Sequence, residues 1–329
     1  MWYARNTHPV NTAIPIVYTF NGRFNRLNFQ EYYSTFIQQA WKLCFFAEEC
    51  LIVKMNSNLH KDTVKSFGDE WNRFDQSELS SADARRIFDE YFAVFPWDRL
   101  PVNSSGFDMG CGSGRWAKLM APLVGHLHCI DPSSALDVAR EALAFAENVS
   151  FHCASVDACP LPPCSQDFGY SLGVLHHVPD TACAIRMCVE MLKPGAPFLV
   201  YLYYAFDNRS KLYRLTWRCS DFIRQAVCRL PSTFKHLVTD TLAALVYFPF
   251  ARFSLLAERM GFNVSAIPLS YYRTHSFYTM RTDSRDRFGT PLEQRFTRLE
   301  IIAMLNAAGL KDISFSEKVP YWCAVGIKR

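Results

Sequence analysis

The stretch that decides the fold is Phe107-Asp108-Met109-Gly110-Cys111-Gly112-Ser113-Gly114. It joins a short apolar segment, typical of a strand, to residues from Trp116 onward in which apolar side chains recur at helical spacing. Glycines at such a junction let the backbone approach a ligand closely, and the start of the following helix presents free N–H groups. The stretch therefore predicts a ligand-binding turn after the first strand of a sheet.

The segments around this turn alternate between strand and helix patterns. Strands are predicted at 106–109, 127–130, 149–154, 168–174 and 198–204. The last of them has no polar alternation, as expected of a strand buried on both faces. Five short strands alternating with helices predict an α/β fold with a doubly wound, mostly parallel sheet. Near the end of the chain, a capping box at Thr297 and Glu300 predicts a further helix, and two more strands are expected near 313–315 and 322–327.

The chain divides into three parts by composition. Residues 1–54 are aromatic-rich with weak periodicity, and Met55 opens a polar stretch typical of a protein start, so we expect 1–54 to be a poorly integrated extension. Residues 55–205 and 283–329 form the predicted ligand-binding domain. Between them, 206–282 is a predicted helical, aromatic and basic insert. Residues 206–275 hold ten Lys and Arg against four Asp and Glu, a local charge of +6, whereas the whole chain carries +4.

Overall composition excludes several classes of protein. Half of the 329 residues are apolar and a fifth are charged, which argues against disorder and coiled coil. The 12 Cys include no CxxC pair and no His/Cys cluster at zinc spacing, so no structural metal is expected. We expect reduced thiols in a cytoplasmic protein, because nothing at the start is typical of a secretory signal. The longest apolar run, Leu242–Phe250, is too short to span a bilayer.

The spacing of the glycines distinguishes between two nucleotide cofactors. A dinucleotide site typically uses GxGxxG, whereas this chain has GxGxG, preceded by an acid. In this feature the chain resembles the class I S-adenosylmethionine-dependent methyltransferases, whose first motif, (D/E)xGxGxG, is matched by Asp108, Gly110, Gly112 and Gly114. Asp131, at the end of the second strand, stands where an acid accepts hydrogen bonds from ribose hydroxyls.

The resemblance covers roughly residues 65–205 and 290–329, and it implies a seven-stranded sheet whose last strand is antiparallel. It implies that S-adenosylmethionine is the cofactor and S-adenosylhomocysteine the product. It also places the adenine beside the end of the third strand and the ligand against the end of the fourth. The positions implied there are Ser155, Val156, Asp157 and Leu172.

Methyl transfer is an in-line displacement that needs alignment, exclusion of water and, for a hydroxyl acceptor, a base. His176, His177 and His275 are the candidate bases, although the family often carries the 176–177 pair without using it in this way. The segment Lys65–Phe74 is predicted to cover the cofactor. The loop Tyr271–His275 is predicted to overhang the carboxyl ends of the strands.

The insert is the only local indication of the acceptor. Its aromatic and basic character predicts an acceptor lid for a small-molecule, lipid-linked or sugar-linked substrate with a hydrophobic body or an anionic group, methylated on oxygen. Contact with an anionic membrane surface is a further expectation. Nucleic acid is not expected, because no RNA-binding module is present. An RNA methyltransferase, a non-catalytic S-adenosylmethionine-binding partner protein and an NAD-dependent oxidoreductase remain alternatives, and the sequence does not indicate the oligomeric state.

Overall fold

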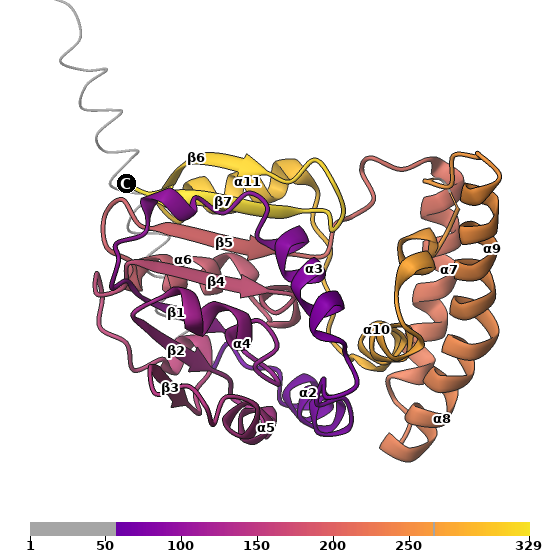
Figure 1. Cartoon of the computed structure of the whole chain (residues 1–329), viewed down its shortest axis with the longest axis horizontal. Coiled ribbons are helices and arrows are strands. Elements are labelled where there is room, and N and C mark those ends of the chain that lie inside the picture. The colour runs from indigo at the N-terminus through magenta and orange to yellow at the C-terminus, as the bar shows by residue number, and fades with distance from the viewer. Residues whose placement is uncertain (1–56, 266) are drawn as a thin grey trace, which may run out of the picture. The chain divides into compact units, whose positions relative to one another are not determined.

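The computed structural model of the chain describes residues 57–265 and 267–329, so the predicted extension at 1–54 lies outside the described residues. Its centre is a seven-stranded sheet in the order β3-β2-β1-β4-β5-β7-β6 (Figure 1). In this sheet β7 runs opposite to the other six strands. The strands are Ser105–Met109 (β1), His126–Ile130 (β2), Val149–His152 (β3), Phe168–Leu172 (β4), Pro197–Tyr201 (β5), Leu310–Phe315 (β6) and Cys323–Lys328 (β7). The predicted α/β fold is confirmed.

The pairing of β1 with β4 at the centre of the sheet depends on two glycines. Gly106 lies opposite Phe168, and Phe107 lies opposite Gly169. A Cβ atom added to Gly106 would come within 2.4 Å of the Phe168 ring, and one on Gly169 within 2.3 Å of the Phe107 ring. Each glycine therefore makes room for the phenylalanine of the other strand.

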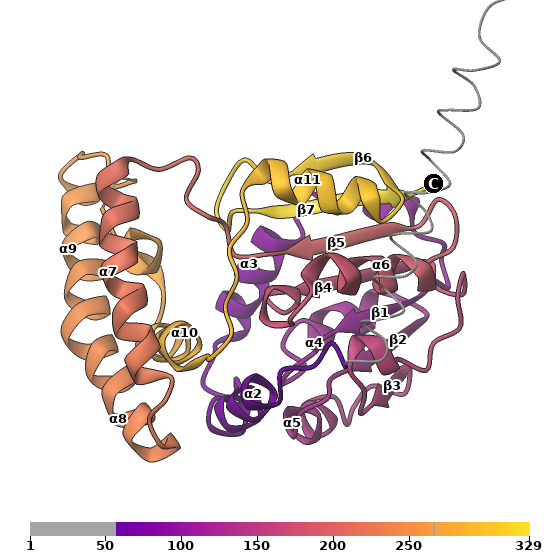
Figure 2. The same ribbon diagram turned by 180° about the vertical axis from the view of Figure 1, so that it is seen from behind.

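Helices cover both faces of the sheet (Figures 1 and 2). One buried cluster joins α6 and α11 to the sheet, and the other joins α3, α4 and α5 to its opposite face. The capping box predicted at Thr297 and Glu300 is present at the start of α11. These helices are Ser81–Tyr91 (α3), Ala117–Met120 (α4), Ala135–Ala142 (α5), Thr181–Met191 (α6) and Arg298–Ala307 (α11).

The insert forms a separate group of helices beside the carboxyl ends of the strands (Figure 1). They are Lys211–Val227 (α7), Ser232–Leu242 (α8), Phe248–Arg259 (α9) and Phe277–Gly289 (α10). Helix α10 crosses the boundary predicted at 282/283, and most of the predicted loop Tyr271–His275 forms a 3₁₀ turn, Ser270–Thr274, just before α10. The difference arises because Ser276 caps a new helix by accepting a hydrogen bond from the Thr279 N–H.

Helix α2 (Lys61–Arg73) connects the insert to the sheet domain. Arg73 forms an ion pair with Asp240 of α8 at 2.5 Å. Nearer its middle, the Ser66 hydroxyl donates to the Gly289 carbonyl at 3.1 Å. These bonds join α2 to both α8 and α10. The segment Lys65–Phe74, which was predicted to cover the cofactor, therefore lies mostly in a helix that contacts both the insert and the sheet domain.

One helical run of the insert is both long and apolar. The apolar run Leu242–Phe250 lies within a continuous helix, Ser232–Arg259, which by length and composition alone is long enough to cross a membrane. The helix continues through Pro249 because the preceding turn, Ala243–Tyr247, is a π-helix whose shifted hydrogen bonds accommodate a residue without an N–H donor. The nine residues Leu242–Phe250 alone are too short to span a bilayer, but the helix that contains them is not.

Candidate functional site

A cavity of about 310 Å³ opens at the carboxyl ends of β1, β4 and β5. The order of the strands reverses between β1 and β4, which is where open α/β sheets bind their ligands. The turn after β1, helix α2, the residues that follow β5 and the start of α7 all contribute to the wall. The cavity therefore connects the glycine-rich turn to the insert.

The glycine-rich turn is shaped by positive backbone angles. Gly110, Gly112 and Gly114 have φ values of +80°, +53° and +77°, which disfavour residues with a side chain. A Cβ atom on Gly110 would come within 2.3 Å of Val174, and one on Gly112 would lie 3.0 Å from the indole nitrogen of Trp71. Gly110 and Gly112 line the cavity, whereas Gly114 does not.

Asp131 is fixed beside this turn. One carboxylate oxygen accepts the Gly112 N–H at 3.0 Å, and the other accepts the N–H and the hydroxyl of Ser133 at 2.8 and 2.6 Å. Burial raises the pKa of Asp131, while these donors oppose the rise. The side chain is nearly buried and faces the cavity, as expected of an acid that binds a ribose.

Of the other residues predicted to bind the cofactor, three line the cavity and Asp157 lies behind its wall. Ser155, Val156 and Leu172 line the cavity. Asp157 does not: its carboxylate accepts the Asn58 N–H at 3.1 Å and the Ser155 hydroxyl at 2.5 Å. Asp157 therefore holds the segment before α2 against the turn after β3, and a direct contact with adenine stays a prediction.

Asp108 lies beneath the turn rather than in the wall. It is fully buried, and burial raises the pKa of its carboxyl to about 8, with the nearby charge of Asp131 acting in the same direction. A carboxyl in this state is protonated at neutral pH and serves as a neutral support under the glycines.

We expect Asp108→Asn to change the pH dependence of stability. Between about pH 4 and 8 the unfolded chain ionises while the folded Asp108 keeps its proton, so the free energy of unfolding falls as the pH rises. Asparagine cannot ionise, so from pH 5.5 to 8 the variant should gain up to about 3 kcal/mol relative to the unmodified protein. Urea denaturation at both pH values measures this, and two proteins that change in parallel would contradict it.

Arg115 was missed by the sequence analysis. It follows the glycines directly and lines the cavity, with its guanidinium 4.2 Å from the centre of the Trp116 ring and 5.7 Å from that of Trp71. It forms no ion pair with an acid among residues 57–265 and 267–329. Arg115 could have been identified from the sequence by its place directly after the glycine-rich turn, because a cation there suits an anionic group of the ligand.

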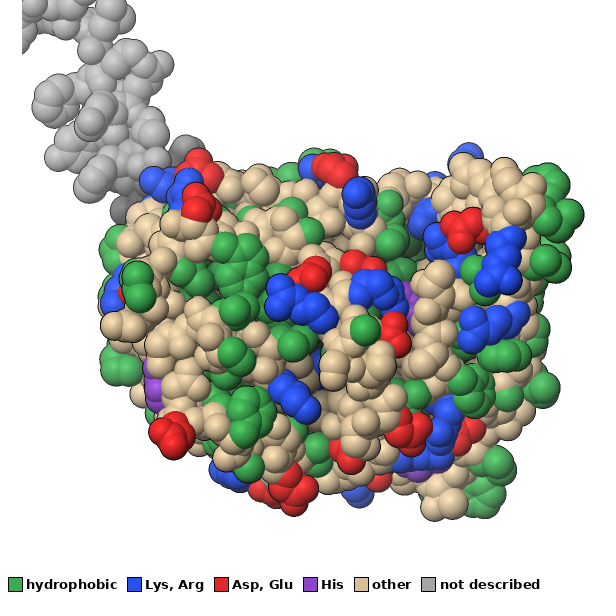
Figure 3. All heavy atoms as spheres, in the orientation of Figure 1, with side chains coloured by type: hydrophobic (Ala, Val, Ile, Leu, Met, Phe, Trp, Pro, Cys, Tyr) green, Lys and Arg blue, Asp and Glu red, His purple; other side chains and the backbone are tan. Residues whose placement is uncertain are grey.

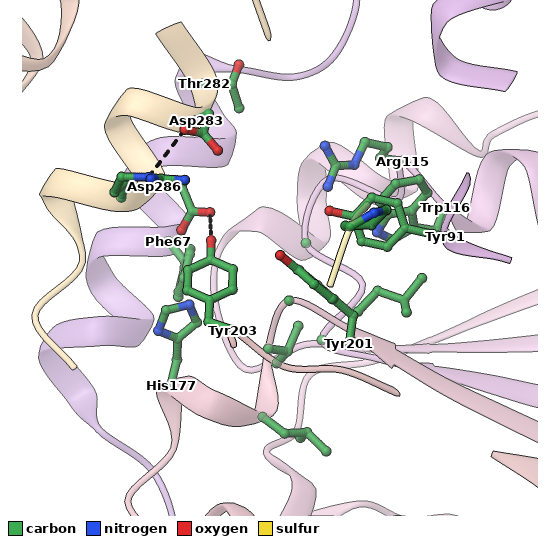
Figure 4. A pocket seen from close by; sticks show the side chains of 18 of the residues that line it. Phe67, Tyr91, Arg115, Trp116, His177, Tyr201, Tyr203, Thr282, Asp283 and Asp286 are labelled. Atoms are coloured by element: carbon green, nitrogen blue, oxygen red, sulfur yellow. Dashed lines mark hydrogen bonds and ion pairs between the residues drawn. The ribbon is translucent and has the colours of Figure 1, made fainter. Parts of the chain in front are cut away.

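The other end of the cavity is aromatic and carries acids. Tyr201, Tyr203 and Tyr271 line it, and the Tyr203 hydroxyl donates to a carboxylate oxygen of Asp286 (Figure 4). The other Asp286 oxygen is buried and has no partner among the described residues. Burial raises the pKa of Asp286 to about 7. This end therefore offers phenol rings and one hydrogen-bonding carboxyl to a second ligand.

Most cations at the aromatic end are paired with acids. Arg287 lies 3.5 Å from Asp283, and Arg295 lies 2.7 Å from Glu293. Arg209, at the rim, donates to the Ser265 carbonyl at 2.9 Å and has no acid partner in the described parts of the chain. The sequence analysis missed Asp283, Asp286 and Arg287, because it ended the insert before them. The high density of charged residues in 281–287 could have indicated these positions.

The three candidate histidines occupy different environments. His177 lines the cavity, with its Nδ1 atom 2.6 Å from the Leu292 carbonyl and its Nε2 atom without a partner among the described residues. His176 is fully buried beneath it, 3.9 Å from the centre of the Tyr203 ring. His275 is buried beside Arg86, outside the wall. Burial lowers the pKa of both His177 and His275 to about 4.

The geometry therefore separates the three. A base must reach the acceptor, and only His177 among them faces the cavity in the described structure. The expected overhang of the Tyr271–His275 loop is present in part, because Tyr271 and Tyr272 line the cavity. His275 instead turns toward Arg86, and the ring centre of Tyr271 lies 4.5 Å from its own.

Known proteins are similar to this chain in sequence. A family model described as a methyltransferase domain matches residues 107–200. A ubiquinone biosynthesis O-methyltransferase of Xanthomonas campestris pv. campestris is 37% identical over 234 residues, which cover 64% of this chain and 95% of that protein. A protein of the same name from Xanthomonas euvesicatoria pv. vesicatoria is 27% identical over 232 residues, with the same coverage. A solved putative methyltransferase from Bacillus halodurans is 13% identical, with a TM-score of 0.44 over 70% of this chain and 71% of that one.

Proposed function

The chain belongs to the class I S-adenosylmethionine-dependent methyltransferases, and from this premise we propose that it methylates a hydroxyl oxygen of a hydrophobic small molecule. The observation that carries the proposal is one continuous cavity. It joins the glycine-rich turn and Asp131 to an aromatic end where the Nε2 atom of His177 has no partner among the described residues. The names of the similar proteins, which are O-methyltransferases, support oxygen as the acceptor atom.

The residues at the glycine-rich end suit S-adenosylmethionine. The turn approaches the cavity without side chains at Gly110 and Gly112, and Asp131 has a carboxylate there for the ribose hydroxyls. Arg115 supplies a cation for the carboxylate of the methionine part. When bound, the cofactor supplies an electrophilic methyl group on a sulfonium.

The aromatic end suits an acceptor with an apolar body. Tyr201 and Tyr271 offer ring faces, and Arg209 at the rim offers a cation to an anionic group. Asp286 has one carboxylate oxygen without a partner in the described structure, and its other oxygen is held by Tyr203. We assign this pair to orienting the acceptor hydroxyl, because a positioned hydrogen bond fixes the direction of attack.

His177 is assigned as the base. Its Nδ1–H donates to the Leu292 carbonyl, which leaves a lone pair on Nε2, and that atom has no partner among the described residues. Because burial keeps the pKa of His177 at about 4, the ring is neutral at physiological pH and can accept the proton that the acceptor hydroxyl loses. Helix α2 and the insert form the opposite wall, which limits access of water to the reacting groups.

Methyl transfer to matched acceptors tests the proposal. The full chain is incubated with S-adenosylmethionine carrying a labelled methyl group and either an alkyl-substituted catechol, the corresponding aromatic amine or total RNA. The label is expected on the catechol oxygen. The double variant Tyr203→Phe/Asp286→Asn should transfer the methyl group about tenfold more slowly, or more slowly still. Label found only in RNA or only on the amine would overturn the proposal.

A further inference from the structure

The insert helices expose a broad apolar face. Only 22% of the apolar stretch within the helical run Ser232–Arg259 is buried. Contiguous apolar surface of this kind on a soluble protein marks an interaction site. Large apolar side chains on it that are more than two-fifths exposed include Leu215, Leu237, Leu245, Phe250, Phe253 and Leu256. We call this surface, on α7, α8, α9 and the π-helical turn between α8 and α9, the insert face.

The opposite side of the same helices packs against protein. Tyr247 and Ala251 are buried in a cluster with Tyr272 and Met280. Arg252 donates to the Arg273 carbonyl at 3.0 Å. A helix that is packed along one side and apolar along the other lies flat on a surface, as interfacial helices do, rather than spanning a bilayer.

The exposed charges on these helices are mostly positive. Among the described residues of α7, α8 and α9, Glu258 is the only exposed acid, and it forms an ion pair with Arg273 at 2.8 Å. Exposed cations on α7, α9 and the link after α7 form no ion pair with any acid that the structure describes. They are Lys211, Arg214, Arg218, Arg229 and Arg259. Figure 3 shows green side chains along the edge formed by α8 and α9, with blue ones beside them.

The insert face continues to the rim of the cavity. Tyr213, in the first turn of α7, lines the cavity next to the exposed Leu212. Ser265 also lines it, and follows the exposed Phe262 at the end of α9. Arg209, just before α7, donates a hydrogen bond to the carbonyl of Ser265, which follows α9. An apolar molecule on the insert face is therefore beside the aromatic end of the cavity.

We propose that the insert face docks on an anionic lipid bilayer and that the acceptor enters the cavity from that bilayer. Docking places the apolar side chains at the lipid boundary and the unpaired cations beside lipid phosphates. The entry route rests on the proposed function, since it presumes a hydrophobic acceptor. A second copy of the chain is disfavoured as the occupant, because a symmetric contact would bring these like charges together.

Vesicle sedimentation tests the docking with the full chain and without any methyl transfer. The protein is mixed with vesicles of phosphatidylcholine alone or with one-third phosphatidylglycerol. Binding is expected mainly to the anionic vesicles, and both Leu245→Glu/Phe253→Glu and Arg214→Glu/Arg218→Glu should weaken it about tenfold or more. Because Phe145 is 60% exposed and Phe253 61%, Phe145→Glu is the matched control for the apolar change. Arg99→Glu/Lys311→Glu is the control for charge.

Three results would overturn the docking proposal. The first is that the protein does not sediment with anionic vesicles. The second is that the insert-face variants and the control variants bind the vesicles equally. The third is that sedimentation velocity without vesicles shows a dimer, which Phe253→Glu dissociates. Calorimetry with S-adenosylmethionine on the same samples separates this failure from a failure of the proposed function, because cofactor binding should be equal in all variants.

Discussion

Asp131→Ala is expected to weaken the binding of S-adenosylmethionine about a hundredfold. The variant loses the carboxylate that accepts the ribose hydroxyls, and charge-assisted hydrogen bonds of this kind contribute about 1.5–3 kcal/mol each. It also frees the Gly112 N–H, which Asp131 holds at 3.0 Å. Isothermal titration calorimetry measures the change directly.

Two further variants make the Asp131 result specific. Asp131→Asn keeps one oxygen acceptor and should lose only about tenfold in affinity, which distinguishes lost charge from a collapsed turn. Asp137→Ala removes an exposed acid on the next helix, where it pairs with Arg140 at 2.7 Å, and should bind as the unmodified protein does. Affinity within threefold for Asp131→Ala would contradict the assignment.

The second large effect is expected at His177. His177→Ala should lower kcat about a hundredfold to ten-thousandfold for a hydroxyl acceptor, because a positioned base contributes that much. The affinity for S-adenosylmethionine should not change, since His177 faces the acceptor end (Figure 4). Steady-state kinetics and calorimetry on the same preparation measure both quantities.

The pH profile tests the identity of the base independently. Only the neutral ring accepts a proton, so with the pKa of His177 at about 4, kcat/KM should show no acid limb between pH 5.5 and 8.5. Burial places the pKa of Asp286 at about 7. An acid limb near pH 7 that disappears in Asp286→Asn, together with a loss of kcat of about a hundredfold or more in that variant, would assign the base to Asp286 and contradict the role of His177.

The sheet and the cofactor end could be predicted because their signals are local. The glycine spacing after β1 requires positive φ at three positions, and the short apolar strands between helices define a parallel sheet. The family prediction is confirmed by the matched domain and the similar proteins. Asp131 lines the cavity, where Gly112 and Ser133 donate hydrogen bonds that hold its carboxylate in place.

The acceptor end could not be predicted because helix α10 has no apolar periodicity. It buries polar side chains, including Thr282, Ser284 and Arg285, and Arg285 pairs with Asp69 of α2 at 3.2 Å. A helix stabilised by such long-range polar contacts does not show the 3.6-residue apolar repeat that a sequence analysis detects. His275 does not line the cavity, and its Nε2 atom lies 3.4 Å from the guanidinium of Arg86 on α3.

The central claim is tested most directly by calorimetric titration of the full-length protein with S-adenosylmethionine and S-adenosylhomocysteine, with NAD as the comparison. The account predicts one site of micromolar affinity for each of the first two ligands and no heat with NAD. An absence of binding to S-adenosylmethionine, or binding to NAD in its place, would contradict the assigned cofactor and the function proposed from it.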